Sequence, residues 1–235
     1  MEVLAGRVLA SVRQQSLIPK GGRVLVALSG GGDSVALLCL MVELARHSEL
    51  SLVGTVHVNH QLRLPAADDD ESFCRALAAR FELPCVVETV DVAMLARQER
   101  VSVEHAGHRA RHQCFDRVAD QLGATEVALG HTLDDQAETY LLRLLRGAGA
   151  AGLSAMRPRL GRIVRPLLTI RRAELRTYLT SRQMPFVEDS SNLDRRVPRN
   201  RVRHDLLPNM ERYAPGLVER IARSAEIARA DEEWL

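Results

Sequence analysis

The sequence Ser29-Gly30-Gly31-Gly32-Asp33-Ser34 lies between a buried apolar run and an apolar helical pattern. Its three glycines allow a ligand to approach the backbone closely. The start of the following helix offers free N–H groups and the positive end of the helix dipole, and the two serines add hydroxyl donors. The pattern predicts a phosphate-binding turn that is neither a Walker loop nor a dinucleotide fingerprint. A plain capped turn between strand and helix is the alternative.

Polar side chains also end two other apolar runs. His57, Asn59 and His60 end one run, and His131 follows another. Asn59 and His60 offer hydrogen bonds that suit ribose or the edge of adenine. We expect His57, Asn59 and His131 to lie at the nucleotide site, and a structural role is the alternative for each.

Two adjacent carboxylates, Asp134 and Asp135, come three residues after His131 at the start of a helical pattern. Carboxylates are hard oxygen ligands that suit Mg²⁺, which makes both residues candidate metal ligands on the phosphates. The alternative is that Asp134 caps the helix and Asp135 favours its dipole.

Short apolar runs alternate with helical periodicity along the first part of the chain. Strands are predicted at 23–28, 52–58, 85–90 and 126–129, and helices at 34–47, 68–81, 105–122, 134–145, 171–182 and 216–231. This alternation predicts an α/β fold with a parallel sheet of about five strands and helices on both faces. Ligands of such sheets bind outside the carboxyl ends of the strands, so the polar groups above should converge there.

The net charge of +2 hides a basic segment. Residues 157–223 hold 16 arginines and 7 acids, whereas the preceding residues carry a net charge of −4. Arginine suits phosphate through its planar fork, so this segment predicts a polyanionic partner, with a solvated surface as the alternative. We place a boundary near residue 160, with an arginine-rich helical subdomain after it.

Composition excludes several classes of protein. No apolar run is long enough for a membrane span, and the first residues lack the pattern of a secretory signal. The four cysteines show no CxxC or metal-ligand spacing and are expected to be reduced. The chain is therefore expected to be cytoplasmic, and its oligomeric state stays open, with a homodimer as one form.

The turn 29–34 matches the SGGxDS signature of the PP-loop ATP pyrophosphatases, which cleave ATP between the α and β phosphates. Further stretches resemble motifs of tRNA(Ile)-lysidine synthases in the same order: 57–63 (HVNHxLR), 130–139 (GHxxDDQAET), 145–153 (RGAGxxGL), 165–168 (RPLL) and 188–203 (EDSSN to RNRVR). The match covers about residues 23 to 230. Third-helix residues Glu104 and Arg111 also match, but Gly107-His108 stands where Ala-Arg is expected and His112 replaces a tyrosine.

The resemblance implies an adenine nucleotide alpha hydrolase-like, Rossmann-like fold, with a PP-loop ATP-pyrophosphatase domain over 1–160 and the helical subdomain over 161–235. It implies ATP and Mg²⁺ as cofactors, and free L-lysine and the anticodon loop of a tRNA(Ile) with a CAU anticodon as partners. The cytosine 2-carbonyl oxygen attacks the α-phosphate, pyrophosphate leaves, and the amino group of lysine then displaces AMP to form lysidine. Aromatic residues make up only 3% of the chain, which argues against broad base-stacking surfaces and favours arginine forks on phosphates.

The same resemblance assigns roles to single residues. Asp33 and Asp134 are candidates for metal binding or for accepting the proton of the lysine ammonium. Arg146 is a candidate catalytic contact to substrate or phosphate, and a helix C-terminal charge is its alternative. The residues expected to contact RNA are Arg111, Arg165, Arg199, Asn200 and Arg203.

Other functions stay open on the sequence. They are another PP-loop enzyme, such as a tRNA thiolase or an amidotransferase-type adenylating enzyme, and a non-catalytic ATP-dependent RNA-binding protein. The absence of CxxC argues against a thiolase, and the chain has no room for a glutaminase unit. Nothing follows Leu235, so we expect a catalytic core, natural or truncated, that selects tRNA weakly.

Overall fold

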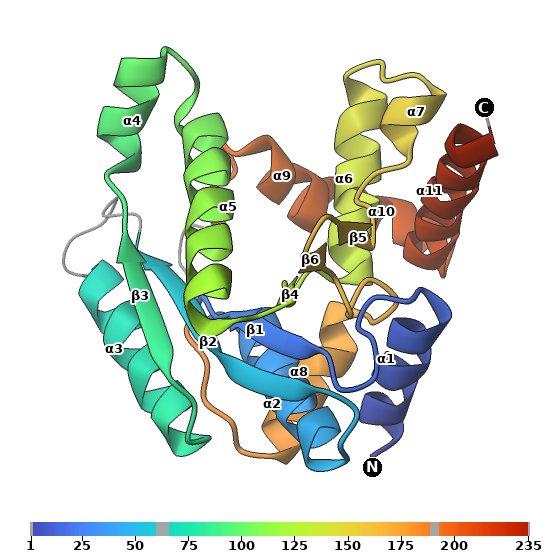
Figure 1. Ribbon diagram of the computed structural model, residues 1–235. Coiled ribbons are helices and arrows are strands. Elements are labelled where there is room, and N and C mark those ends of the chain that lie inside the picture. Colours follow the sequence, from blue (N-terminus) through green and yellow to red (C-terminus); the bar gives the residue numbers. More distant parts are fainter. Residues whose placement is uncertain (1, 60–65, 189–192, 235) are drawn as a thin grey trace.

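The computed structural model describes residues 2–59, 66–188 and 193–234. In this part of the chain, six strands form one sheet in the order β3-β2-β1-β4-β6-β5 (Figure 1). The strands are β1(Arg23–Ala27), β2(Ser51–Asn59), β3(Cys85–Thr89), β4(Glu126–Ala128), β5(Arg159–Leu160) and β6(Ile163–Val164). All neighbouring strands pair in parallel except β5 and β6, which form an antiparallel hairpin. The predicted α/β fold is confirmed.

Strand β1 shows why this sheet needs cover on both faces. Val24 and Val26 face one core and Leu25, between them, faces the other, and all three are fully buried. Since successive side chains of a strand point to opposite faces, a continuous apolar run belongs to a central strand.

Helices cover the two faces unequally. Helices α1(Val3–Gln14), α2(Gly32–Arg46), α3(Ala66–Arg80) and α8(Arg172–Ser181) pack on one face. Helix α5(Val103–Leu122) packs on the other, and α4(Val92–Glu99) packs against α5. The sequence pattern does not predict α1 or α4. Helix α1 has an apolar stripe but no side-chain cap at Glu2, so its start carries no signal.

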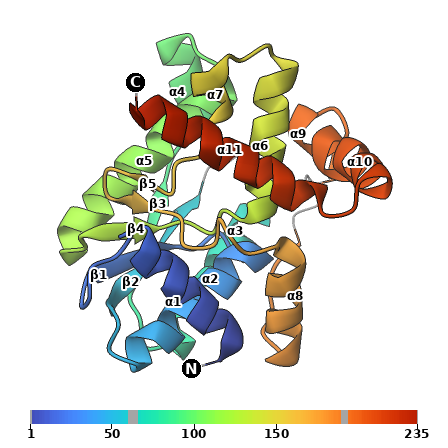
Figure 2. The same cartoon turned by 90° about the vertical axis from the view of Figure 1, so that its right-hand side faces the viewer.

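A third apolar core joins helix α6(Leu133–Leu145) to the C-terminal helices α10(Leu207–Tyr213) and α11(Leu217–Trp234) and to the turn before α10. The short helix α9(Pro198–Arg201) also lies against α6. A π-helical turn, η2(Val202–Leu206), links α9 to α10, and the short helix α7(Ala150–Leu153) follows α6. Figure 2 shows α11 lying across α6. No helix in the described part of the chain is long and apolar enough to cross a bilayer.

The boundary expected near residue 160 falls inside the hairpin of β5 and β6. The following segment, from Leu167 to Met184, packs in the same core as α1 and α2. The arginine-rich segment is therefore divided between two layers. Helix α8 packs on the sheet, and the helices α9 to α11 pack against α6.

The strand order reverses at β1. The chain passes from β1 outward to β2 and β3, and then returns to β4 on the other side of β1. At such a switch point the loops that follow the two central strands diverge to opposite sides and leave a crevice at the carboxyl ends of the strands. The loop after β1 is 28–31 and the loop after β4 is 129–132, so both predicted motifs lie at this crevice.

Candidate functional site

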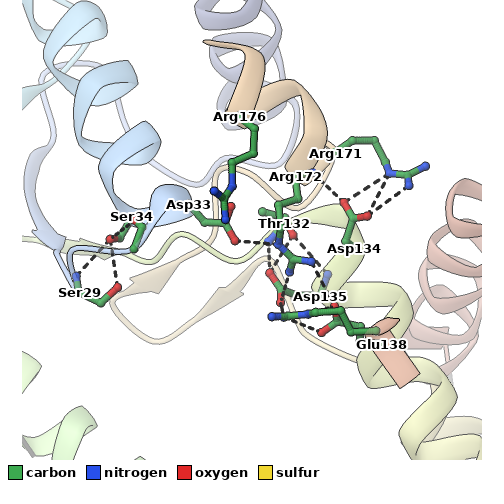
Figure 3. A network of polar contacts seen from close by, with 12 residues as sticks. Ser29, Asp33, Ser34, Thr132, Asp134, Asp135, Glu138, Arg171, Arg172 and Arg176 are labelled. Atoms are coloured by element: carbon green, nitrogen blue, oxygen red, sulfur yellow. Dashed lines mark hydrogen bonds and ion pairs between the residues drawn. The ribbon is translucent and has the colours of Figure 1, made fainter. Parts of the chain in front are cut away.

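The loop after β1 is held in shape by its own polar groups. The Ser29 amide donates a hydrogen bond to Ser34 Oγ (3.2 Å) (Figure 3). Ser34 Oγ donates to the Gly31 carbonyl (2.8 Å). Gly30 has a φ of +86°, which a side chain would strain. Gly31 is the N-cap of α2 and supplies no capping side chain. The start of α2 therefore offers backbone donors to an anion. We call residues 29–34 the phosphate cradle.

The loop after β4 touches this cradle backbone to backbone. A Cβ at Gly130 would lie 3.0 Å from the carbonyl carbon and oxygen of Asp33 and 3.1 Å from the Ser34 nitrogen. Only glycine permits this approach without a shift of one loop. The contact between the Gly130 and Asp33 backbones places the start of α6 next to Asp33.

Helix α6 begins with a capping box whose cap is Thr132, not the Asp134 named in the alternative to metal binding. The N-cap is Thr132, whose Oγ1 accepts a hydrogen bond from the Asp135 amide (3.3 Å). Asp135 Oδ2 in turn accepts from the Thr132 amide (2.8 Å). The alternative reading of Asp134 as the cap is therefore wrong, because the capping oxygen belongs to Thr132.

Arg172, the first residue of α8, joins the cradle to α6. Its guanidinium lies 3.0 Å from Asp33 Oδ2, 2.8 Å from Asp135 Oδ1 and 3.2 Å from Glu138 Oε1 (Figure 3). Its backbone amide donates to Asp134 Oδ2 (2.7 Å), and Arg171 also pairs with Asp134 (3.2 Å). One residue therefore contacts every carboxylate that the sequence marks as a candidate.

Two more arginines reach the same carboxylates from the C-terminal helices. Arg199 lies 2.8 Å from Glu138 and 3.1 Å from Asp135. Arg203 lies 2.7 Å from Glu138 and 3.2 Å from Asp135. Glu138 is fully buried. Although burial opposes it, the Arg172 and Arg199 guanidiniums hold the pKa of Asp135 well below its usual range.

These six residues form what we call the acid–arginine cluster: Asp33, Asp135, Glu138, Arg172, Arg199 and Arg203. With the acids ionised, three negative and three positive charges balance. Its carboxylates are paired with guanidiniums from three other elements, α8, α9 and η2, as buried charges require.

Asp33 differs from the other acids of the cluster. Its Oδ1 is buried and has no hydrogen-bond partner among the described residues, while Oδ2 faces Arg172. Burial raises its pKa, and the Arg172 guanidinium only partly opposes that rise. An ionised carboxylate oxygen without a partner in a buried place is a site for a cation or a donor from a ligand.

The donor set tests the expected Mg²⁺ site. Asp33 Oδ1 is free to coordinate, whereas both oxygens of Asp135 are already hydrogen-bonded and Asp134 is held by Arg171 and the Arg172 amide. In the described residues no group of three or more histidine, cysteine or acidic side chains is placed to hold a metal ion. Asp33 therefore fits the metal as it stands, and the two α6 acids would first have to release arginines.

The nucleotide candidates on β2 support the cradle from behind. His57 is 5% exposed, and its Nδ1–H donates to the Leu28 carbonyl, directly before Ser29 (2.9 Å). Asn59 is also buried and makes a long hydrogen bond to Glu71 (3.5 Å). His60 lies outside the described residues.

His131 lies at the end of β4 beside Arg165. Arg165 is buried, and its Nε lies 3.3 Å from His131 Nδ1. Burial, together with the charges of Arg165, Arg199 and Arg111, lowers the pKa of His131 to about 4, although the charge of Asp135 opposes the shift. His131 is thus neutral at physiological pH, and its Nδ1 accepts the hydrogen bond from Arg165.

Other expected residues are spread more widely. Arg146 is exposed at the C-cap of α6, about 18 Å along the helix from Asp134. Asn200 is buried and donates to the Asp194 carbonyl (3.0 Å), which folds the segment before α9. Arg111 is exposed on α5. The structure brings Arg199 and Arg203 to Asp135, and it leaves Arg146 away from the cradle.

Sequence reasoning missed Arg172 and Glu138. Arg172 stands in a segment full of arginines, so its type does not distinguish it there. Glu138 does carry a signal, since it lies four residues after Asp134 and three after Asp135 and so shares a helix face with both. Glu138 pairs with Arg172, Arg199 and Arg203 across 34 to 65 positions, and these pairings have no sequence period.

The matches to known proteins agree with this geometry. Residues 5–210 match the family described as PP-loop domain. A tRNA(Ile)-lysidine synthase of Geobacter sulfurreducens is 46% identical over 237 residues, which cover 100% of this chain and 50% of that protein. The tRNA(Ile)-lysidine synthase of Solibacter usitatus is 42% identical over 93% of this chain and 48% of its own length. The chain thus spans about half the length of the curated relatives it matches.

Among solved structures, the U34-tRNA thiolase NcsA from Methanococcus maripaludis superposes with a TM-score of 0.76 at 18% identity. The superposition covers 94% of this chain and 78% of that one. At that identity the likeness concerns the fold alone.

Proposed function

The chain belongs to the PP-loop domain family, and we propose that it catalyses the ATP-dependent attachment of lysine to the wobble cytidine of tRNA(Ile) with a CAU anticodon. The observation that carries this proposal is the 46% identity to a tRNA(Ile)-lysidine synthase along the whole of this chain. The convergence of the SGGxDS and GHxxDD motifs at the crevice between β1 and β4 supports it.

The proposed reaction has two steps at one site. The 2-carbonyl oxygen of cytosine attacks the α-phosphate of ATP and pyrophosphate leaves, which gives an adenylated base. The amino group of free L-lysine then attacks carbon 2 of the adenylated cytosine, and AMP leaves. Transfer of a phosphoryl or adenylyl group depends on positioning and charge neutralisation more than on a protein nucleophile.

The phosphate cradle supplies the positioning. The first N–H groups of α2 would bind the phosphates at the start of the helix. The hydroxyl of Ser29 donates to Ser34 Oγ and that of Ser34 donates to the Gly31 carbonyl, so both hold the loop in shape. Asp33 would hold Mg²⁺ through its unpartnered Oδ1; that ion, when bound, would neutralise charge on the pyrophosphate. Asp134 fixes the start of α8 through Arg171 and Arg172. If Asp134 or Asp135 accepts a proton or joins the metal, it must exchange a guanidinium first.

The RNA side of the proposal falls on exposed arginines near the crevice. Arg111 is exposed and the Arg199 side chain is 37% exposed, so both can reach a phosphate. Arg165, Asn200 and the less exposed Arg203 would support this surface from beneath. Arg146, at the far end of α6, is then an RNA contact rather than a group that touches the reacting atoms. A protein with these substrates is expected to act in the cytoplasm.

The cysteines do not favour a thiolase. Burial raises the pKa of Cys39 to about 11 and that of Cys74 to about 12, so both thiols stay protonated at neutral pH. Thiolate is the form that binds clusters and attacks sulfur.

Transfer of radiolabelled lysine to an unmodified tRNA(Ile) transcript tests the proposal. We expect labelled RNA only with ATP present, and none when the wobble cytidine is replaced by uridine. ATP and RNA binding without pyrophosphate release would instead identify a non-catalytic binding protein, and labelling of the uridine transcript would contradict the proposed chemistry.

A further inference from the structure

Helix α5 carries two histidines whose rings pack together. The ring centroids of His108 and His112 are 4.2 Å apart with 32° between the planes, and His112 is 6.3 Å from the ring of Phe115. The three residues follow a spacing of four and three, so they share one face of the helix. His108 is exposed, His112 is half-buried and Phe115 is buried. The stripe thus runs from the core to the surface.

The stripe leads from the core toward the catalytic crevice. Phe115 packs in the same core as Leu129 and Ile163, and Leu129 directly precedes Gly130 and His131. Because α5 leads from β3 to the parallel strand β4, it runs opposite to the strands, and its first half projects beyond their carboxyl ends (Figure 1). Each helical turn rises about 5.4 Å, so His112 and then His108 lie successively farther beyond the carboxyl ends of the strands.

The charges around His112 come from α5 and from the end of β6. Burial lowers its pKa, and His108, Arg165 and Arg111 lower it further, while Asp116 opposes them. Arg165 and Arg111 also act on His131, so the histidine pair and the end of β4 share the same two guanidiniums. An uncharged flat ring beside arginines is the combination that binds single-stranded nucleic acid, since the ring stacks on a base and the arginines contact phosphates.

The nucleotide candidates lie on the other side of the sheet. On β2, Val56 and Val58 pack toward α5, so the alternate residues His57 and Asn59 point to the face that α2 and α3 cover. If the adenine of ATP lies near Asn59, the α5 side of the crevice is left to the second substrate. Both histidines also stand where the sequence departs from the lysidine synthase pattern.

We propose that His108 and His112 form a stacking surface for an unpaired base of the RNA substrate, with Arg111 on the adjoining phosphate. This inference rests on the proposed function. It names a contact on a different element from the cradle, so the two sites can be tested separately.

The test measures two affinities in four proteins. The probes are a fluorescent anticodon stem-loop with a CAU loop and the ATP analogue α,β-methylene-ATP. The proteins are the wild type, a His108→Ala/His112→Ala variant, a His108→Phe/His112→Phe variant and, as a control, His47→Ala. His47 is an exposed histidine at the C-cap of α2. Because α2 runs opposite to the strands, His47 lies at their amino ends, away from the cradle.

Loss of a stacked base should weaken stem-loop binding about five- to a hundredfold in the double alanine variant. The double phenylalanine variant keeps flat rings and should stay within about threefold of the wild type. Analogue binding should be unchanged in both, which also shows that the variants fold. Unchanged stem-loop affinity in the alanine variant, equal losses in the alanine and phenylalanine variants, or a matching loss of analogue affinity would each overturn the inference. Failure of the wild type to bind the stem-loop would instead refute the proposed function on which it rests.

Discussion

The phosphate cradle and the acid–arginine cluster adjoin at Asp33, but they meet their binding needs in different ways. The cradle offers backbone amides at the start of α2, and a ligand would complete it. The cluster is charge-balanced without a ligand, since its acids and arginines neutralise one another, although Asp33 Oδ1 has no hydrogen-bond partner among the described residues. A site that awaits an anion therefore sits against one that is already charge-balanced. The cluster fixes the positions of α6, α8 and the C-terminal helices relative to one another, and the cradle faces the substrate.

The largest effect expected from this contrast is on stability. Glu138→Ala removes a fully buried carboxylate and leaves Arg172, Arg199 and Arg203 crowded without it. Removing one partner of a buried pair costs about 3–5 kcal/mol of unfolding free energy. Urea unfolding measures the loss. Asp120→Ala, which breaks an exposed pair with Arg162, should cost less than about 1 kcal/mol. Equal costs for the two variants would show that the cluster is not a buried network.

A smaller loss is expected where the two loops touch. Gly130→Ala places a methyl group 3.0 Å from the Asp33 backbone, which should cost about 1–3 kcal/mol and weaken binding of an ATP analogue as the cradle shifts. Gly6→Ala in α1 meets no atom within 4 Å and should stabilise the protein by about 0.5–1 kcal/mol. Unaltered nucleotide affinity in Gly130→Ala would mean that the loops are not coupled.

The pH dependence of stability tests the surroundings of His131. Burial and the nearby arginines lower its pKa to about 4 in the folded chain, against about 6.5 when unfolded. Between these values the unfolded chain binds more protons, so stability falls as the pH drops, by about 2 kcal/mol between pH 7 and pH 5. Urea midpoints should show a shallower fall in His131→Asn and the wild-type fall in His47→Gln. A wild-type slope in His131→Asn would place the titration elsewhere.

The smallest effect separates an exposed arginine on α5 from one held in the acid–arginine cluster. Arg111→Gln should lower the salt slope of stem-loop binding by about 0.7 to 0.9, as for one lost phosphate contact. Arg203→Gln, whose guanidinium is held by Glu138 and Asp135, should leave that slope unchanged while lowering stability. A slope that falls only in Arg203→Gln would reverse the roles assigned to the two positions.

The sequence predicts the cradle better than the cluster. Glycines, a strand and a helix start are local signals. From the strand order alone, the switch-point rule then predicts that residues 131–135 lie near Ser29. Pairing of charges is not local: Arg172 meets Asp33 across 139 residues and Asp135 across 37. The residue type alone does not distinguish an arginine that binds phosphate from one that neutralises a buried acid. For that reason Arg199 and Arg203 were predicted as RNA contacts, and their ion pairs with α6 were not.

Arg146 and α1 show two further limits. The motif around Arg146 marks a position in the family, but the length of α6 sets it about 18 Å from the cradle. Helix α1 packs on the main core through Ala5, Val8 and Val12, although it has no cap that would announce it.

Exchange of labelled pyrophosphate into ATP, with the anticodon stem-loop present and lysine absent, tests the central claim most directly. The wild type should catalyse exchange only when the RNA is present, because the cytosine oxygen is the nucleophile of the first step. Asp33→Ala should lower the rate at least about a hundredfold, since it removes the carboxylate at the cradle. Asp68→Ala, an exposed acid on α3, should leave the rate unchanged. Exchange without RNA, or a folded Asp33→Ala variant with the wild-type rate, would contradict the account.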